Sequence, residues 1–242
     1  FHIYGPALMD SKENSGIDCW LKRVNHPIID SWYQGAREGK SYHKDHGEGY
    51  DPYHVGDSLG CGGLALWIDG QMYLSNVYRQ YRVLANGPEE AVFEVEYIWS
   101  GMEQETREVR RFTLKAGSQF FKSESQFFIE GKPAQVEVAI GVTTHDGNAL
   151  PYLDTNRSWV ASWENMHAAG LGTGVVLADS THARGLTITS YEKDRSHVIL
   201  ITPTDKKGRI TYHGGFAWEK AGEIATASEW RNYIEQFSRN LK

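Results

Sequence analysis

The stretch VFEVEYIW, residues Val92–Trp99, alternates apolar and acidic side chains and decides the fold class. If it is extended, its odd-numbered apolar side chains lie on one face, and Glu94 and Glu96 lie on the other. Alternation with a period of two is typical of an antiparallel strand that buries one face and exposes the other. The stretch therefore predicts a strand on the surface of a packed β-structure.

Further segments with strand character follow along the chain. They read RRFTLKAG, QFFKSESQFFIEG, AQVEVAIGVTTH, TGVVLAD, GLTITSYE, HVILITPT and RITYHGGFAW. Turn signals separate them, among them Asn86-Gly87-Pro88 and Glu130-Gly131-Lys132-Pro133. Strands spaced this closely predict an all-β fold, a large antiparallel β-sandwich.

One segment near the end of the chain has clear helical character. Thr226 and Glu229 form a T-x-x-E capping box at its start. Apolar side chains then recur at helical spacing, at Trp230, Ile234, Phe237 and Leu241. We expect this helix to pack across the sandwich, and with no repeat or linker visible, residues 1–242 predict a single domain.

Composition limits the classes of partner. The chain of 242 residues has a formal net charge of −6, which argues against nucleic acid, because phosphate binding needs a basic field. An anionic substrate is still compatible if a few cations gather in one cleft. No stretch of about 20 apolar residues is present, so we expect no membrane-spanning helix. The eight Trp and thirteen Tyr are consistent with a ring-binding cleft or with a bulky β core.

The first residues of the chain and the two cysteines each support a further prediction. The opening FHIYGPALMD reads like the inside of a strand, so we expect an N-terminal segment to be missing. Cys19 and Cys61 are the two cysteines. They form one disulfide in an oxidising compartment or remain two buried thiols, and the sequence leaves both readings open.

The segment from Ser41 to Gly63 is rich in histidine, tyrosine and glycine and predicts a long ordered loop. One reading is a metal site, with ligands from the loop and one more from a strand. The candidate ligands are His43, Asp45, His46, Glu48 and His54, with His145 or His213. The H-x-x-H spacing lacks the cysteine or helix context of known metal sites, so a histidine cluster without a metal is the alternative.

A second reading is acid–base chemistry. Histidine can donate or accept a proton near neutral pH, and arginine can clamp a carboxylate with two nitrogens. The segment YLSNVYRQYRV supplies Tyr78 and Arg79. The arginine either binds a substrate carboxylate or forms an internal ion pair. His145 and His213 lie at strand ends, where loops begin. Motifs of serine hydrolases and nucleotide-binding enzymes are absent from the sequence.

Four stretches resemble a known family. The sequences HGEGYDPYHVGDSLGCGGLAL, YRQYRVLANGP, LKAGSQF and IYGPAL are similar to the bacterial domain-of-unknown-function 4861 family, from Ile3 to about Phe237. Members occur in polysaccharide-utilisation clusters of Bacteroidota. The resemblance implies a fold similar to the galactose-mutarotase supersandwich and a periplasmic location. One branch resembles oligosaccharide dehydratases that act on ulvan, removing water from a terminal uronic acid.

Dehydration of a uronate across C4 and C5 requires a cation on the carboxylate, a base for the C5 proton and an acid for the leaving oxygen. We expect Arg79 or Arg37 on the carboxylate, His46 and His145 as base or carboxylate partner, and Tyr50 or Tyr78 as acid or base. Further contacts with substrate are expected from His43, Glu48, His213, Trp218 and Trp32. We expect no cofactor. A lyase that cleaves uronate links and a non-catalytic carbohydrate-binding protein are the alternatives.

Overall fold

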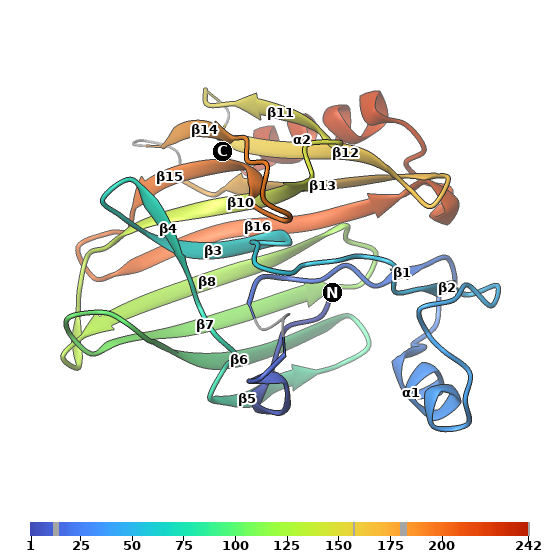
Figure 1. Cartoon of the computed structure of the whole chain (residues 1–242), viewed down its shortest axis with the longest axis horizontal. Helices are drawn as coiled ribbons and strands as arrows, with labels where there is room; N and C mark the ends of the chain where they lie inside the picture. Colours follow the sequence, from blue (N-terminus) through green and yellow to red (C-terminus); the bar gives the residue numbers. More distant parts are fainter. Residues whose placement is uncertain (12–14, 157, 180–182, 242) are drawn as a thin grey trace.

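The computed structural model describes residues 1–11, 15–156, 158–179 and 183–241, and antiparallel strands dominate it (Figure 1). The strands in the first half of the chain are β1 Leu21–Lys22, β2 Gly49–Tyr50, β3 Cys61–Ile68, β4 Gln71–Leu74, β5 Gln80–Asn86, β6 Glu90–Trp99 and β7 Thr106–Lys115. Those that follow are β8 Phe120–Ile129, β9 Lys132–Pro133, β10 Glu137–His145, β11 Leu150–Asp154, β12 Trp159–Met166, β13 Ala169–Leu177, β14 Arg184–Ile188, β15 Ser196–Pro203 and β16 Arg209–Trp218.

The strands form two large sheets. The larger has the order β11-β12-β13-β16-β8-β7-β6-β5, with β9 also pairing to β8, and the smaller has the order β14-β15-β10-β3-β4. β1 and β2 form a separate pair near the chain start. The ribbon shows the large sheet sweeping from β5 and β6 up to β11, with β3 and β10 lying across its middle (Figure 1). The prediction of a large antiparallel β-sandwich is confirmed.

The alternating stretch that predicted the fold lies in β6. Val95 and Tyr97 are buried on the face that meets the smaller sheet. Glu94 lies on the opposite face, where it accepts hydrogen bonds from both Arg82 and Arg111. The period of two therefore reports the two faces correctly, and the acidic face is neutralised by neighbouring strands.

The inner face of the large sheet also contains a buried ion pair. Arg110 Nε donates to Glu108 Oε1 at 2.7 Å, and Nη2 donates to Oε2 at 2.9 Å. Their side chains are 3% and 0% exposed, and the guanidinium lies 4.9 Å from the ring centroid of Tyr97. This bidentate geometry satisfies the carboxylate, because both of its oxygens accept a charge-assisted bond.

The C-terminal helix α2, Ala227–Asn240, begins with the predicted capping box at Thr226 and Glu229. It packs against β12 and β13, on the outer face of the large sheet. A Cβ atom at Gly172 would lie 2.5 Å from Trp230, so glycine on β13 lets the helix approach closely. The indole of Trp230 donates to the Thr173 carbonyl at 3.0 Å, which fixes the helix on the strand.

A second helix, α1, covers Ile29–Arg37 and was not predicted. Pro27 precedes it, and Asp30 and Arg37 lie in its first and last turns, as the helix dipole favours. Short 3₁₀ turns occupy Pro6–Leu8 and Glu219–Ala221. Neither helix in the described part of the chain is long and apolar enough to cross a membrane.

Candidate functional site: an aromatic cavity beside a histidine-rich loop

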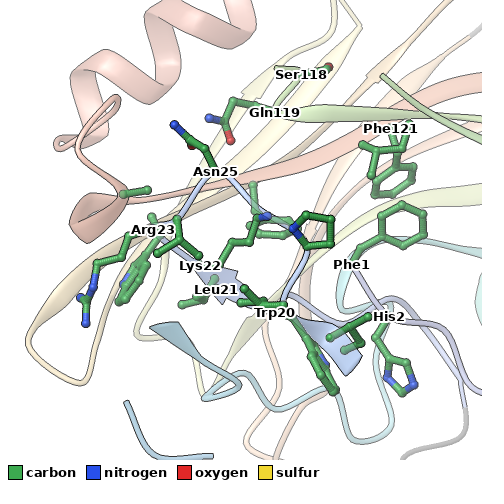
Figure 2. Close-up of a pocket in the computed structure, with 18 of the residues that line it drawn as sticks. Phe1, His2, Trp20, Leu21, Lys22, Arg23, Asn25, Ser118, Gln119 and Phe121 are labelled. Carbon is green, nitrogen blue, oxygen red and sulfur yellow. The ribbon is translucent and has the colours of Figure 1, made fainter. Parts of the chain in front are cut away.

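A cavity of about 610 Å³ lies between the N-terminal segment and the inner face of the large sheet. The ends of β7, β8 and β16 form one wall, and β1, α1 and the residues between them form the other. Figure 2 places Phe1 and Phe121 together on one side and Arg23 on the opposite side. Aromatic side chains dominate the lining: Phe1, Trp20, Trp32, Tyr33, Phe121, Phe216 and Trp218. Both the volume and this lining are typical of small-ligand pockets.

Trp32 and Trp218, the two tryptophans expected to stack on sugar rings, both line this cavity. Trp32 is the buried residue of α1, and its ring stacks on Trp20 with centroids 5.8 Å apart. Trp218 ends β16 and is 3% exposed, and its indole nitrogen has no hydrogen-bond partner among the described residues. Two segments far apart in sequence thus present indole rings to the same space.

Two cations from β1 and the residue after it stand at the cavity. Lys22 is exposed, and its Nζ donates to the His26 carbonyl at 2.8 Å. Arg23 lies over the Trp218 ring at 5.2 Å, and it also binds Asp45 and the Gly47 carbonyl. Arg23 therefore ties the histidine-rich loop to the cavity wall, whereas the charge of Lys22 has no carboxylate partner in the described chain.

The loop that follows α1 carries several predicted site residues. Burial raises the pKa of Asp45, but the Gly47 N–H and Arg23 outweigh this and lower it, so the carboxylate stays ionised. Tyr50 is buried against Trp218 at 5.8 Å, and its hydroxyl lies 3.3 Å from His167. Burial, and then Asp45, raise the pKa of Tyr50 and keep the phenol protonated.

None of the predicted loop residues, Tyr50 included, is among those that line the large cavity. His43 is exposed and lies 3.3 Å from Asp51. His46 and Glu48 line a smaller cavity of about 120 Å³ with Trp32. The His46 imidazole is exposed and 3.0 Å from the Ser41 carbonyl. The two cavities share Trp32, and His46 and Glu48 lie outside the large one.

His145 lies in a cluster of two imidazole–carboxylate pairs, here called the His54–His145 cluster. His145 Nδ1 is 3.0 Å from Glu164, and its Nε2 is 2.9 Å from the His54 carbonyl. His54 Nε2 is in turn 2.9 Å from Asp194. Burial lowers the pKa of His145, but Glu164 outweighs this and raises it. Both ring nitrogens are engaged, so His145 ties the loop at His54 to Glu164.

Strained backbone coincides with the His54–His145 cluster. His145 and Asp194 both have positive φ angles, of 49° and 63°, which are uncommon outside glycine. Gly56 has φ +51°, and a Cβ there would lie 2.8 Å from the Asp194 Cγ and 3.1 Å from the His54 Nε2. The glycine in YHVGD is therefore required for the pair to form.

Four predicted residues lie elsewhere in the fold: His213, Arg37, Arg79 and Tyr78. His213 contacts Phe237 of α2, on the outer face of the sheet. It is an odd number of residues from Trp218 on the same strand, so the two side chains point to opposite faces. Burial, and then Lys122, lower the pKa of His213 to about 4. His213 therefore does not line the aromatic cavity, and its contact with a substrate stays a prediction.

Arg37 ends α1, where it is exposed and is not among the residues that line the cavity. Arg79 is exposed just before β5, and Tyr78 lines a separate hollow of about 350 Å³ with Tyr81. The expected meeting of the predicted carboxylate clamp with His46 and His145 does not occur, since no hydrogen bond, ion pair or ring contact joins them among the described residues. Their individual catalytic roles stay predictions.

Several cavity residues were missed from the sequence: His2, Trp20, Lys22, Arg23 and Tyr33. Burial, and then Tyr42, raise the pKa of Tyr33. No local motif marks them, because each enters the site through the packing of the N-terminal segment.

The described residues contain no group of three or more His, Cys, Asp or Glu side chains arranged to hold a metal ion. Cys19 and Cys61 are both free and buried thiols. Burial, followed by the neighbouring Cys61, raises the pKa of the Cys19 thiol, so it stays protonated.

Comparisons with known proteins place the chain in a family. A solved structure from Klebsiella pneumoniae subsp. pneumoniae MGH 78578, provisionally assigned as an aldose 1-epimerase, shares 9% identity and a TM-score of 0.36. That likeness covers 75% of this chain and 66% of the other, and it carries no inference about activity.

An uncharacterized protein, P7, of Formosa agariphila is 32% identical over 252 residues. The match covers all of this chain but 62% of the relative, so a single domain over residues 1–242 stays a prediction. A family profile matches residues 1–242. The chain therefore belongs to the family described as Domain of unknown function (DUF4861).

Proposed function

We propose that this chain is the sugar-binding and catalytic part of a carbohydrate-active enzyme. It would remove water across C4–C5 of a terminal uronic acid in an oligosaccharide such as ulvan, leaving an unsaturated uronate. The observation that carries the proposal is the aromatic cavity, which Trp32 and Trp218 both line beside Lys22 of β1 and Arg23. Indole faces suit the apolar faces of sugar rings, and a cation suits a carboxylate.

The charges at the cavity favour an anionic sugar over a neutral one. The chain as a whole is acidic, with a net charge of −6, yet Lys22 and Arg23 stand together at this cavity. Arg23 is paired with Asp45, and Glu223 is the one carboxylate in the described lining, so Lys22 is the cation left for a substrate. Lys22 has no carboxylate partner in the described chain, so a substrate carboxylate would supply one. A cation there would also stabilise the charge that develops when the C5 proton leaves.

A second candidate is a non-catalytic carbohydrate-binding protein. It is favoured by one specific observation: His46, His145 and Tyr78, expected to transfer protons, do not line the aromatic cavity. Under this alternative the tryptophans bind the sugar and no bond changes.

We propose the periplasm as the compartment, which fractionation of cells carrying the intact protein would test.

The test is incubation of the intact protein with a panel of uronate-capped oligosaccharides, including ulvan fragments. The expected product absorbs in the ultraviolet, because its double bond is conjugated with the carboxylate, and its mass is lower by one water without chain shortening. A shortened chain would instead indicate a lyase, and binding without product would indicate the non-catalytic alternative. We expect activity to survive dialysis against a chelator, since the proposal needs no cofactor.

The sugar-binding role of the cavity is tested separately with Trp32→Ala. Loss of one aromatic contact is worth about 0.5–1.5 kcal/mol, so the Kd for the oligosaccharide should rise about 2- to 12-fold. Trp163→Ala is the matched control, because this indole packs against Gly170 and is not among the cavity residues. Equal affinities of the two variants would exclude the cavity as the sugar site.

A further inference from the structure

Among the histidines that the structure describes, His2 is the one that lines the aromatic cavity. The imidazoles to which sequence patterns drew attention are not among the 22 lining residues: His43, His46, His54, His145 and His213. If an oligosaccharide binds in this cavity, His2 is therefore the imidazole closest to the reaction. Its side chain is 29% exposed, which leaves part of the ring facing the space.

The backbone sets His2 opposite a buried carboxylate. His2 and Asp18 form an antiparallel bridge, with N–H donation to the partner's carbonyl at 3.0 and 2.9 Å in the two directions. Directly paired residues project their side chains to the same side. His2 Nδ1 consequently lies 3.6 Å from Asp18 Oδ2, and the Asp18 side chain is 6% exposed.

A third residue fixes the carboxylate. The indole nitrogen of Trp20 donates to Asp18 Oδ2 at 2.8 Å. The same indole ring contacts the His2 imidazole at 5.5 Å between centroids, and Tyr4 contacts it from another side at 5.0 Å. The imidazole is thus held by two aromatic rings, with one nitrogen aimed at Asp18.

Two polar atoms of this arrangement have no hydrogen-bond partner among the described residues. They are His2 Nδ1 and Asp18 Oδ1, and both are buried. Buried polar atoms are almost always hydrogen-bonded, so two unsatisfied atoms on neighbouring side chains are unusual. Catalytic hydrogen bonds are often long without substrate and shorten when it binds. A small rotation of His2 would close the 3.6 Å gap to Asp18.

We propose that His2 transfers the proton in this cavity and that Asp18, held by Trp20, is its positioning residue; this assignment rests on the proposed dehydration. With Nδ1–H directed at Asp18, the lone pair on Nε2 accepts the proton from C5 of the uronate. The C5–H electron pair becomes the C4–C5 double bond, and the C4–O bond breaks with its electrons on oxygen. The imidazolium then returns its proton to that oxygen, which leaves as water, so His2 and Asp18 end unchanged.

The experiment compares His2→Ala, His2→Gln and Asp18→Asn in the intact protein, with initial rates followed by ultraviolet absorbance. General base catalysis contributes about 10²- to 10⁴-fold to the rate. The kcat of both His2 variants should therefore decrease by a factor of about 10² to 10⁴, while KM changes little. Added imidazole should restore part of the rate of His2→Ala, which a structural defect would not allow. Asp18→Asn should lower kcat at unchanged KM, and Asp18→Glu should recover part of it.

His26→Ala is the matched control, because this exposed imidazole also faces a carboxylate, 3.5 Å from Glu48, but does not line the cavity. It should keep its rate within about twofold. Wild-type turnover together with full activity of His2→Ala overturns the assignment but leaves the proposed function intact. Oligosaccharide binding by the wild type without any product overturns the proposed function, and the assignment with it.

Discussion

Gly56→Ala would test whether the backbone at the His54–His145 cluster exists to bring His54 and Asp194 together. Gly56 has φ +51°, where an L side chain costs about 1 kcal/mol. The added methyl would also collide with the Asp194 carboxylate and lie 3.1 Å from the His54 Nε2. The pair must therefore separate, and a hydrogen bond to a charged group is worth about 1.5–3 kcal/mol.

Because the His54 side chain is 42% exposed, we take the lower end of that range. Gly56→Ala should then lose about 2.5 kcal/mol of unfolding free energy, of which about 1 kcal/mol is backbone strain. Gly131→Ala is the matched control, since Gly131 has φ +74° and nothing lies within 4 Å of the position that an added methyl would occupy. It should lose the strain term of about 1 kcal/mol and no more.

Urea unfolding followed by tryptophan fluorescence measures both variants. The difference of about 1.5 kcal/mol corresponds to about 3–6 °C in melting temperature for a chain of this size. Histidine NMR signals should shift for His54 in Gly56→Ala and stay in place in Gly131→Ala. Equal losses of stability, within about 0.5 kcal/mol, would refute the reasoning and reduce Gly56 to an ordinary turn glycine.

Two further predictions concern buried charge. Glu108→Gln leaves Arg110 buried without its carboxylate and should lower the free energy of unfolding by about 3–5 kcal/mol. Glu124→Gln, from an exposed pair, should lower it by less than about 1 kcal/mol. Similar losses in urea unfolding of the two variants would contradict the role of the buried pair. Burial lowers the pKa of His197 to about 4, below the unfolded value near 6.5. Stability from this neutral imidazole is complete above pH 6.5 and falls by about 3 kcal/mol as pH drops to 4. His197→Gln should flatten the curve of unfolding free energy against pH between pH 6.5 and 4. An unchanged slope in this range would count against the role of His197.

The fold could be predicted because its signals are local. In β6, alternate residues report the two faces of one strand, and the structure buries Val95 and Tyr97 as the pattern requires. The capping box at Thr226 marks the start of α2 within one turn. Helix α1 escaped notice because it is nine residues long, contains Gly35 and buries only Trp32. A helix that contributes one side chain to a core leaves little periodicity to detect.

The candidate site was harder to predict because the sequence does not indicate which strands and loops pack next to one another. The period of two says that His213 and Trp218 lie on opposite faces, but not which face borders a cavity. His145 was correctly placed at a strand end, yet its partner Glu164 comes from β12 of the other sheet, which comes near only through the packing of the two sheets. Arg79 carried the right charge for a clamp, but it lies just before β5, at the edge of the large sheet.

The relation of His2 to Asp18 shows why chemistry-bearing residues can lack any sequence signal. The two are joined by an isolated bridge rather than by a regular strand pair, so neither segment has the alternation that would reveal it. What selects His2 over the other histidines that the structure describes is its place on a cavity wall, a property of packing between distant segments. Loop composition pointed instead to His43 and His46, whose imidazoles are exposed. Richness in histidine indicates where imidazoles are frequent, whereas catalysis depends on which one faces an enclosed substrate.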